Sequence, residues 1–362
     1  MLKWTYRSKL NTQATTYECM TFYCRYILKM MFAGILVVYA GSFQPLHAQN
    51  HKTLDEKFKN AVQEAKSIER IRSLLIQQNK EMLVHKYYGN ASQDWPYNIK
   101  SASKSIISVL IGIAVDEEYL ALDETLGDYF PDYFTRKPDD QKETIMLRNL
   151  LTMQAGLETA SFHNYGRWVI SDNWVEWVLG RDMIAKPGGK MVYSTGISHL
   201  LSVILTNAVG MSTKRFAQKH LFGPLDITLG GWDQDPQGYY MGGNNLALKP
   251  MDMLKIGQMM LNGGIYQGRR IVSEEWVNNT FETYTRSNFN PYNYGYMWWN
   301  KSVAGELVYF AWGFGGQYIF VVPDLEAVIV ITSSLNGATQ KRSYKRAVFD
   351  LLGQDIFPKI RR

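Results

Sequence analysis

The chain has 362 residues, of which 46% are hydrophobic and 20% are charged, enough to bury a sizeable core in one or two domains. Its 39 basic and 33 acidic side chains give a net charge of +6, but five of the former and one of the latter lie within 1–48. The remaining 34 and 32 leave a net charge of +2 and no basic stripe, which argues against nucleic acid as a partner.

The N-terminal segment 1–48 has the pattern of a secretory signal with a long basic head. Five basic residues precede an apolar stretch at 30–41, and the segment ends in Leu-His-Ala, where a small residue marks a cleavage site. The stretch is short for a membrane span, and a retained N-terminal membrane anchor is the alternative. We therefore predict an exported protein, periplasmic or secreted, whose translation begins at Met1 or at Met30 or Met31.

Both cysteines, Cys19 and Cys24, fall in this leader, so the mature chain would have neither disulfides nor a cysteine nucleophile. The histidines that remain after cleavage are scattered, and no two of them have the His-x-x-x-His spacing of a metal site. We therefore predict no metal and no cofactor, and we interpret these histidines as surface or core residues.

Downstream of the leader, strand-forming segments stand at both ends of the chain and helix-forming segments in the middle. Thr53 and Glu56 form a capping box that opens an amphipathic helix, and a hairpin follows at 73–88. The stretch 105–285 reads as mostly helical, with a second apolar helix at 197–209. Before a terminal helix come three β-rich segments, at 307–311, 318–322 and 327–332.

This order predicts an α+β fold, with one antiparallel sheet built from both chain ends and a mostly helical domain inserted between them. We place the first part of the sheet domain at 49–100, the helical domain at 101–290 and the second part of the sheet domain at 291–362.

The helical domain opens with Ser101-Ala102-Ser103-Lys104, directly before an apolar run at 106–115. In a helix, residues three apart share a face, so Lys104 would point at Ser101, and the helix N-terminus would favour an anion there. Because the helix is apolar on nearly every face, burial would lower the pKa of the lysine and leave an amine able to take the serine proton. The alternative is an ordinary solvated Ser-Lys pair at a helix start.

Two further segments would complete a hydrolase site. Tyr193 follows a Pro-Gly-Gly turn and precedes a buried helix, so its phenol would handle a leaving-group proton; the alternative is a packing tyrosine. The segment Trp-Gly-Phe-Gly-Gly-Gln at 312–317 opens a strand, and its glycines would let backbone N–H groups approach an oxyanion. The alternative for this segment is a glycine-rich hairpin without such a role.

Taken in order, these segments make the chain similar to the penicillin-binding-protein-like serine hydrolases: class C β-lactamases, esterases of that fold and nylon-oligomer hydrolases. The resemblance covers most of the chain after the leader and implies a β-lactamase/transpeptidase-like fold. Besides the Ser-x-x-Lys motif, its markers are Leu-Leu-Thr-Met-Gln-Ala-Gly-Leu at 150–157, Tyr193-Ser194-Thr195, Pro224-Leu225, Tyr-Gly-Tyr-Met-Trp-Trp at 294–299 and Gly-Phe-Gly-Gly-Gln-Tyr at 313–318.

The resemblance implies a role for each of these residues. Ser101 would attack a carbonyl and become acylated, Lys104 would accept its proton, and Tyr193 would relay protons to the leaving group and from the deacylating water. The backbone N–H groups of Ser101 and Phe314 would hold the oxyanion. The substrate cleft would be lined by Trp312, Gly313, Gly315 and Thr195.

Two departures from the β-lactamase pattern bear on the substrate. The last strands carry no Lys-Thr-Gly, whose lysine would pair with the carboxylate of a β-lactam or a peptidoglycan stem peptide. Thr195 stands where the tyrosine motif has an asparagine. An apolar cleft would instead be walled by Trp298, Trp299, Trp312 and Phe314, the alternative being that some of these side chains are core.

We therefore predict an exported serine hydrolase that forms an acyl-enzyme on a small-molecule or short-peptide substrate, an ester or a non-lactam amide. The alternatives are a D-Ala-D-Ala carboxypeptidase or weak class C-type β-lactamase and, in a different class, a catalytically idle binding or sensor domain on the same fold. The oligomeric state is left open.

Overall fold

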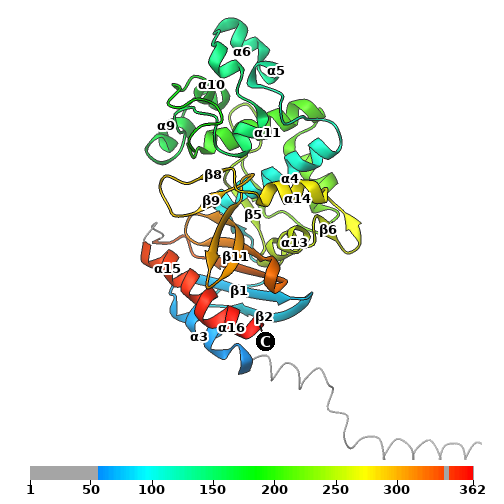
Figure 1. The fold of residues 1–362 in the computed structure, drawn as a ribbon, viewed down its shortest axis with the longest axis vertical. Coiled ribbons are helices and arrows are strands. Elements are labelled where there is room, and N and C mark those ends of the chain that lie inside the picture. The colour runs from blue at the N-terminus through cyan, green and yellow to red at the C-terminus, as the bar shows by residue number, and fades with distance from the viewer. Residues whose placement is uncertain (1–55, 338–341, 362) are drawn as a thin grey trace, which may run out of the picture. The chain divides into compact units, whose positions relative to one another are not determined.

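An eight-stranded antiparallel sheet organises the fold (Figure 1). The computed structural model, which describes residues 56–337 and 342–361, gives the strand order β2-β1-β13-β12-β11-β10-β9-β8. The strands are β1 (Ile71–Gln78), β2 (Glu81–Tyr87), β8 (Thr285–Arg286), β9 (Asn293–Tyr294), β10 (Trp299–Val303), β11 (Glu306–Gly313), β12 (Gln317–Val322) and β13 (Ala327–Ser333). The predicted α+β fold, with one sheet from both chain ends, is confirmed.

The hairpin predicted at 73–88 is confirmed as β1 and β2. Its two-residue turn consists of Asn79 and Lys80, whose φ angles of 49° and 67° give the left-handed conformation that matches the twist of paired strands. The helix before it, α3, spans Lys59–Ser67. Thr53, the predicted cap of that helix, lies outside the described residues.

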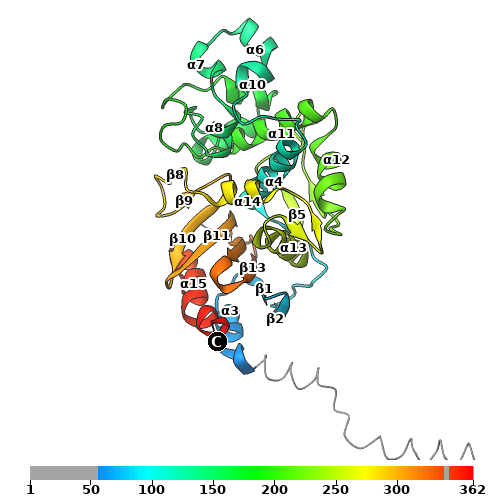
Figure 2. The same ribbon diagram turned by 45° about the vertical axis from the view of Figure 1, so that its right-hand side comes forward.

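Helices cover both faces of the central strands. As a result, β12 and β13 are buried along their whole length. On one face lies α13 (Pro250–Leu261), and Gly257 lets it approach: a Cβ there would stand 2.5 Å from Val328 Cγ1. Figures 1 and 2 show the other face covered by α3 and by two C-terminal helices, α15 (Arg342–Asp350) and α16 (Phe357–Ile360).

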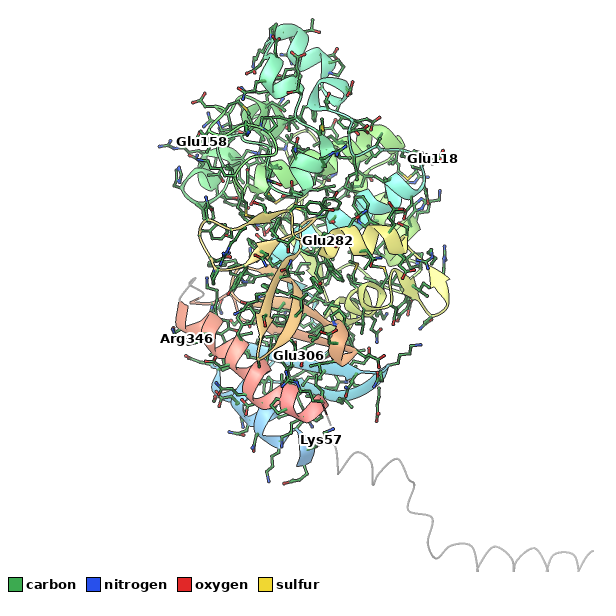
Figure 3. The ribbon with its side chains drawn as sticks, in the orientation of Figure 1. Lys57, Glu118, Glu158, Glu282, Glu306 and Arg346 are labelled. Atoms are coloured by element: carbon green, nitrogen blue, oxygen red, sulfur yellow. The ribbon has the colours of Figure 1, made fainter. Side chains whose placement is uncertain are left out.

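The middle of the chain is mostly helical, as predicted. Two helices in it are buried on nearly every side, α4 (Ser103–Asp116) and α11 (Thr195–Val209), and they pack against each other. Shorter helices surround them: α5 (Leu126–Tyr129), α6 (Pro131–Arg136), α7 (Asp140–Glu143), α8 (Leu147–Leu151), α9 (Tyr165–Val169), α10 (Trp174–Leu179), α12 (Thr213–Ala217) and α14 (Glu274–Phe281). In Figure 3, Glu158 and Glu118 lie in this helical part and Glu306 on the sheet, with side chains filling the space between.

Small elements join the sheet and the helices. A second sheet pairs β3 (Tyr97–Asn98) with β5 (Leu246–Leu248) and β5 with β4 (Gly231–Trp232), and a two-stranded hairpin joins β6 (Ile265–Tyr266) to β7 (Arg269–Arg270). The described residues belong to one compact unit. The division at 100 and 290 stays a prediction.

Within the described part of the chain, none of the helices combines the length and the apolar character needed to cross a bilayer. The predicted leader at 1–48 lies outside the described residues.

Candidate active site

Ser101 lies in a single turn of 3-10 helix, η1 (Lys100–Ala102), which runs directly into α4. The preceding residue, Lys100, has a φ of 52°, an uncommon conformation for a residue with a side chain. Two hydrogen bonds fix it: its N–H donates to Asn98 Oδ1 (3.0 Å), and its carbonyl accepts from Ser103 Oγ (2.7 Å). The serine predicted as nucleophile is therefore held at the mouth of a buried helix.

Lys104 is buried one turn further along, with 1% of its surface exposed. Its Nζ donates to three oxygen atoms: Ser101 Oγ at 3.2 Å, Thr195 Oγ1 at 3.2 Å and the Gly243 carbonyl at 2.7 Å. Loss of hydration lowers the pKa of this amine from 10.5 to about 7. Near neutral pH about half of the amine is therefore uncharged and able to accept the serine proton.

Tyr193, two residues before α11 begins, completes the predicted trio. The centroid of its ring lies 5.1 Å from Lys104 Nζ, and the ring stacks on Trp299 with the centroids 5.8 Å apart. Burial raises the pKa of the Tyr193 phenol, and a hydrogen bond to Ser101 lowers it in part. The phenol therefore keeps its proton at neutral pH, as a donor to a leaving group must.

Thr195 is almost fully buried, and its predicted role in lining a cleft stays a prediction. It is the first residue of α11, is 5% exposed, and accepts a hydrogen bond from Lys104. Ser161 fixes it from behind, since the Ser161 hydroxyl contacts Thr195 Oγ1 and accepts the Thr195 N–H, both at 2.8 Å. The short side chain turns inward because its hydroxyl finds two buried partners there.

The Gly243 carbonyl is a contact that the sequence analysis missed. A Cβ at Gly243 would stand 2.0 Å from Ser198 Oγ and 3.0 Å from Lys104 Nζ, so any larger residue would push this segment away. The adjacent Gly242 is equally tight, with a Cβ position 2.0 Å from the Ser198 carbonyl. The Gly-Gly pair was the signal in the sequence, because a pair of glycines indicates close backbone approach.

The glycine-rich turn after β11 approaches the loop that precedes Ser101. A Cβ at Gly313 would lie 2.0 Å from the carbonyl of Ile99, two residues before Ser101. Gly315 and Gly316 follow with φ of 85° and 105°, and the Phe314 side chain is 38% exposed. The turn is thus beside the nucleophile loop, and binding of an oxyanion by the N–H groups of Ser101 and Phe314 stays a prediction.

The aromatic residues near this turn divide into core and surface. Trp298 is 1% exposed and packs on Phe281, so the prediction that it walls a cleft is wrong. Trp299 is 3% exposed and lies beneath Tyr193 as a support rather than a wall. Trp312 is half-buried, with its ring 5.8 Å from that of Trp299.

Two exposed phenylalanines, not identified from the sequence, flank Tyr193 instead. Phe162 is 53% exposed and Phe289 is 41% exposed, with their ring centroids 5.5 Å apart. Their centroids lie 6.2 and 5.6 Å from that of Tyr193. Phe162 also has a φ of 54°, an outlier for a bulky residue that is often found at functional sites. We refer to these two side chains as the phenyl pair.

Among residues 56–337 and 342–361, no group of three or more His, Cys, Asp or Glu side chains is arranged to hold a metal ion.

The chain is similar to several known proteins. The sequence model of the beta-lactamase family matches residues 72–353. A 6-aminohexanoate-dimer hydrolase from Paenarthrobacter ureafaciens is 24% identical over 298 residues, which cover 72% of this chain and 72% of that protein. Two solved structures share the fold. An octameric penicillin-binding protein homologue from Pyrococcus abyssi is 19% identical with a TM-score of 0.65, over 83% of this chain and 78% of that chain. EstCE1, a hydrolase with promiscuous acyltransferase activity, is 17% identical with a TM-score of 0.67, over 84% of this chain and 99% of that chain.

The lowered pKa of Lys104 predicts how the reactivity of Ser101 depends on pH. Because Lys104 must be uncharged to accept a proton, the reactivity of Ser101 should rise with pH, reach half its maximum near pH 7 and level off above. The rate of labelling by a fluorophosphonate, measured from pH 5 to 9, checks this. Lys104→Ala should lose the pH dependence and about 10² to 10⁴ of the rate. A rate that is still rising steeply at pH 9 would instead indicate a hydrated lysine.

Proposed function

The chain belongs to the beta-lactamase family, a family of serine hydrolases, and on that premise we propose that Ser101, Lys104 and Tyr193 cleave esters or non-lactam amides. The observation that carries the proposal is the hydrogen bond of 3.2 Å between Lys104 Nζ and Ser101 Oγ, in a site where burial lowers the pKa of the amine to about 7. An intact nucleophile and base argue against an idle binding domain.

The proposed reaction has two balanced halves. Ser101 Oγ attacks the carbonyl carbon while its proton moves to Lys104 Nζ, and the bond from the carbonyl carbon to the leaving oxygen or nitrogen then breaks as Tyr193 donates a proton to that atom. The proton on Lys104 Nζ then passes to the Tyr193 phenolate, which restores both groups. In the second half, water attacks the acyl carbon and gives a proton to the same pair of groups. The bond between that carbon and Ser101 Oγ breaks as the pair returns the proton to Oγ, and a carboxylic acid leaves. The N–H groups of Ser101 and Phe314 would stabilise the oxyanion in both halves.

The proposed substrate preference follows from the groups that lie near Ser101 and Tyr193. The turn at 313–316 presents backbone groups and a phenyl ring where a β-lactamase would have the lysine that pairs with a carboxylate. The exposed phenyl pair offers apolar contact beside Tyr193. Two similar proteins, the 6-aminohexanoate-dimer hydrolase and the hydrolase EstCE1, are named as hydrolases rather than as β-lactamases, which supports the same preference.

Activity-based labelling tests the nucleophile and the substrate class together. A fluorophosphonate should label the wild type at Ser101, and Ser101→Ala should abolish labelling. The matched control is Ser108→Ala on the same helix, because the Ser108 hydroxyl is buried with no hydrogen-bond partner in the described structure, and it should label normally. We expect kcat/KM for p-nitrophenyl acetate to exceed that for nitrocefin by roughly 100-fold, the size expected when a carboxylate lacks its charged partner. The opposite order would restore the β-lactamase alternative, and no adduct would favour an idle domain.

The phenyl pair should act on the leaving group, since it lies beside the phenol that protonates it. Phe289→Ala should lower kcat/KM for phenyl acetate about tenfold relative to methyl acetate, since an aromatic contact contributes up to about 1.5 kcal/mol. Both esters form the same acetyl-enzyme, so its rate of hydrolysis should not change. Leu307→Ala is the control, because Leu307 is equally exposed, at 41%, and lies at the far end of β11. Slower deacylation in Phe289→Ala would place the acyl group against these rings instead.

We also propose export to the periplasm or the medium, on the basis of the basic and apolar pattern of 1–48. N-terminal sequencing of the full chain after expression in a bacterium should find Gln49 as the first residue. A membrane-bound product that keeps the leader would support the anchor instead.

A further inference from the structure

A buried histidine and aspartate lie behind the catalytic lysine without touching it. His199, one helical turn after Thr195 in α11, faces Asp235 with 2.8 Å between Nε2 and Oδ2. Both side chains are fully buried. The rings of Trp168 and Trp174 pack on the imidazole with centroids 5.8 and 5.5 Å away, so Asp235 supplies the charge that faces it.

The contacts of Asp235 determine which nitrogen of His199 carries the proton. Oδ1 accepts the backbone N–H groups of Gln237 (2.9 Å) and Tyr239 (2.8 Å), which leaves Oδ2 to accept the proton on His199 Nε2. Nδ1 therefore presents a lone pair, and it accepts the N–H of Gly242 at 3.4 Å. The histidine thus bridges a carboxylate on one side and a glycine N–H on the other.

Gly242 is joined to the residue whose carbonyl holds the lysine. The pair Gly242–Gly243 lies so close to α11 that a Cβ on either would come within 2.0 Å of Ser198. The Gly243 carbonyl then reaches Lys104 Nζ at 2.7 Å, the shortest of the three hydrogen bonds recorded for that amine. Two consecutive residues, Gly242 and Gly243, therefore connect the imidazole to the base.

We propose that His199 and Asp235 form a positioning pair that holds the Gly243 carbonyl against Lys104 and so keeps the amine aligned with Ser101. The inference rests on the proposed function, since it requires Lys104 to act on Ser101. Neither residue contacts the trio of Ser101, Lys104 and Tyr193 through a recorded hydrogen bond, so their effect passes through the Gly242–Gly243 segment.

Asp235→Asn tests the pair with little change in shape. The two N–H groups at Oδ1 require the amide oxygen there, so the new NH₂ would face His199 Nε2 and drive the histidine proton to Nδ1. That proton would oppose the Gly242 N–H and release the Gly243 carbonyl. We expect the plateau rate of fluorophosphonate labelling to fall roughly 10- to 100-fold. The midpoint of the pH profile should move about one unit lower, because the ammonium form of Lys104 loses an acceptor.

Thr332→Val is the control for stability alone. It removes one partner of another fully buried pair, Ser73 and Thr332, whose hydroxyl oxygens are 2.6 Å apart in the sheet. It should lower the melting temperature while leaving the labelling rate and pH midpoint of folded protein unchanged. His199→Gln is the second test, since its amide can still pair with Asp235 but cannot reach Gly242, and it should behave as Asp235→Asn does.

The readouts separate the two proposals. Wild-type rate and midpoint in both Asp235→Asn and His199→Gln, measured on folded protein, would overturn the positioning pair and leave the proposed function intact. A fall in melting temperature with no change in midpoint would assign the pair a structural role only and would also overturn the inference. Absence of labelling in the wild type would overturn both proposals.

Discussion

An amine enclosed by three oxygen atoms at the mouth of a buried helix is the constraint on which the site depends. Lowering the pKa of Lys104 from 10.5 to about 7 means that burial disfavours its charged form by about 5 kcal/mol. The Gly243 carbonyl, Ser101 and Thr195 offer the ammonium partial compensation. The two protonation states are then nearly balanced at neutral pH. The proposed mechanism requires such a balance, because it needs one atom to take a proton from Ser101 and return it later in the cycle.

Such an enclosure needs segments far apart in the sequence to meet within the reach of one side chain. The apolar helices α4 and α11 bury each other and fix the positions of Lys104 and Thr195. The remaining approaches depend on residues without side chains, Gly243 against Ser198 and Gly313 against Ile99. Rigid helices thus set the direction of the polar groups, while glycines set how closely the neighbouring backbone can come.

The parts of this arrangement that are local in sequence could be predicted, and the parts that depend on long-range contacts could not. The spacing of Ser101 and Lys104 follows from one helical turn, and the β1–β2 hairpin and the last three strands follow from apolar patterning and turn residues. The inward turn of Thr195 depends on Ser161, which no periodicity reveals. Gly243 can approach α11 only because it has no Cβ, and a sequence pattern does not show which backbone a glycine will approach. Strands of two residues such as β8 and β9 are too short to show any alternation.

In the proposed mechanism, the groups that perform chemistry and the groups that contact the substrate are separate. Thr195 commits its hydroxyl to Lys104 and Ser161 and is 5% exposed, so it has little left with which to bind a ligand. The exposed groups nearby are phenyl rings carried by loops: Phe162 at the start of η2 (Phe162–Asn164) and Phe289 between β8 and β9. Loops tolerate substitution far better than a buried amine does. If these rings contact the substrate as proposed, substitutions in the two loops would change the range of substrates and leave the protonation balance of the buried Lys104 as it is.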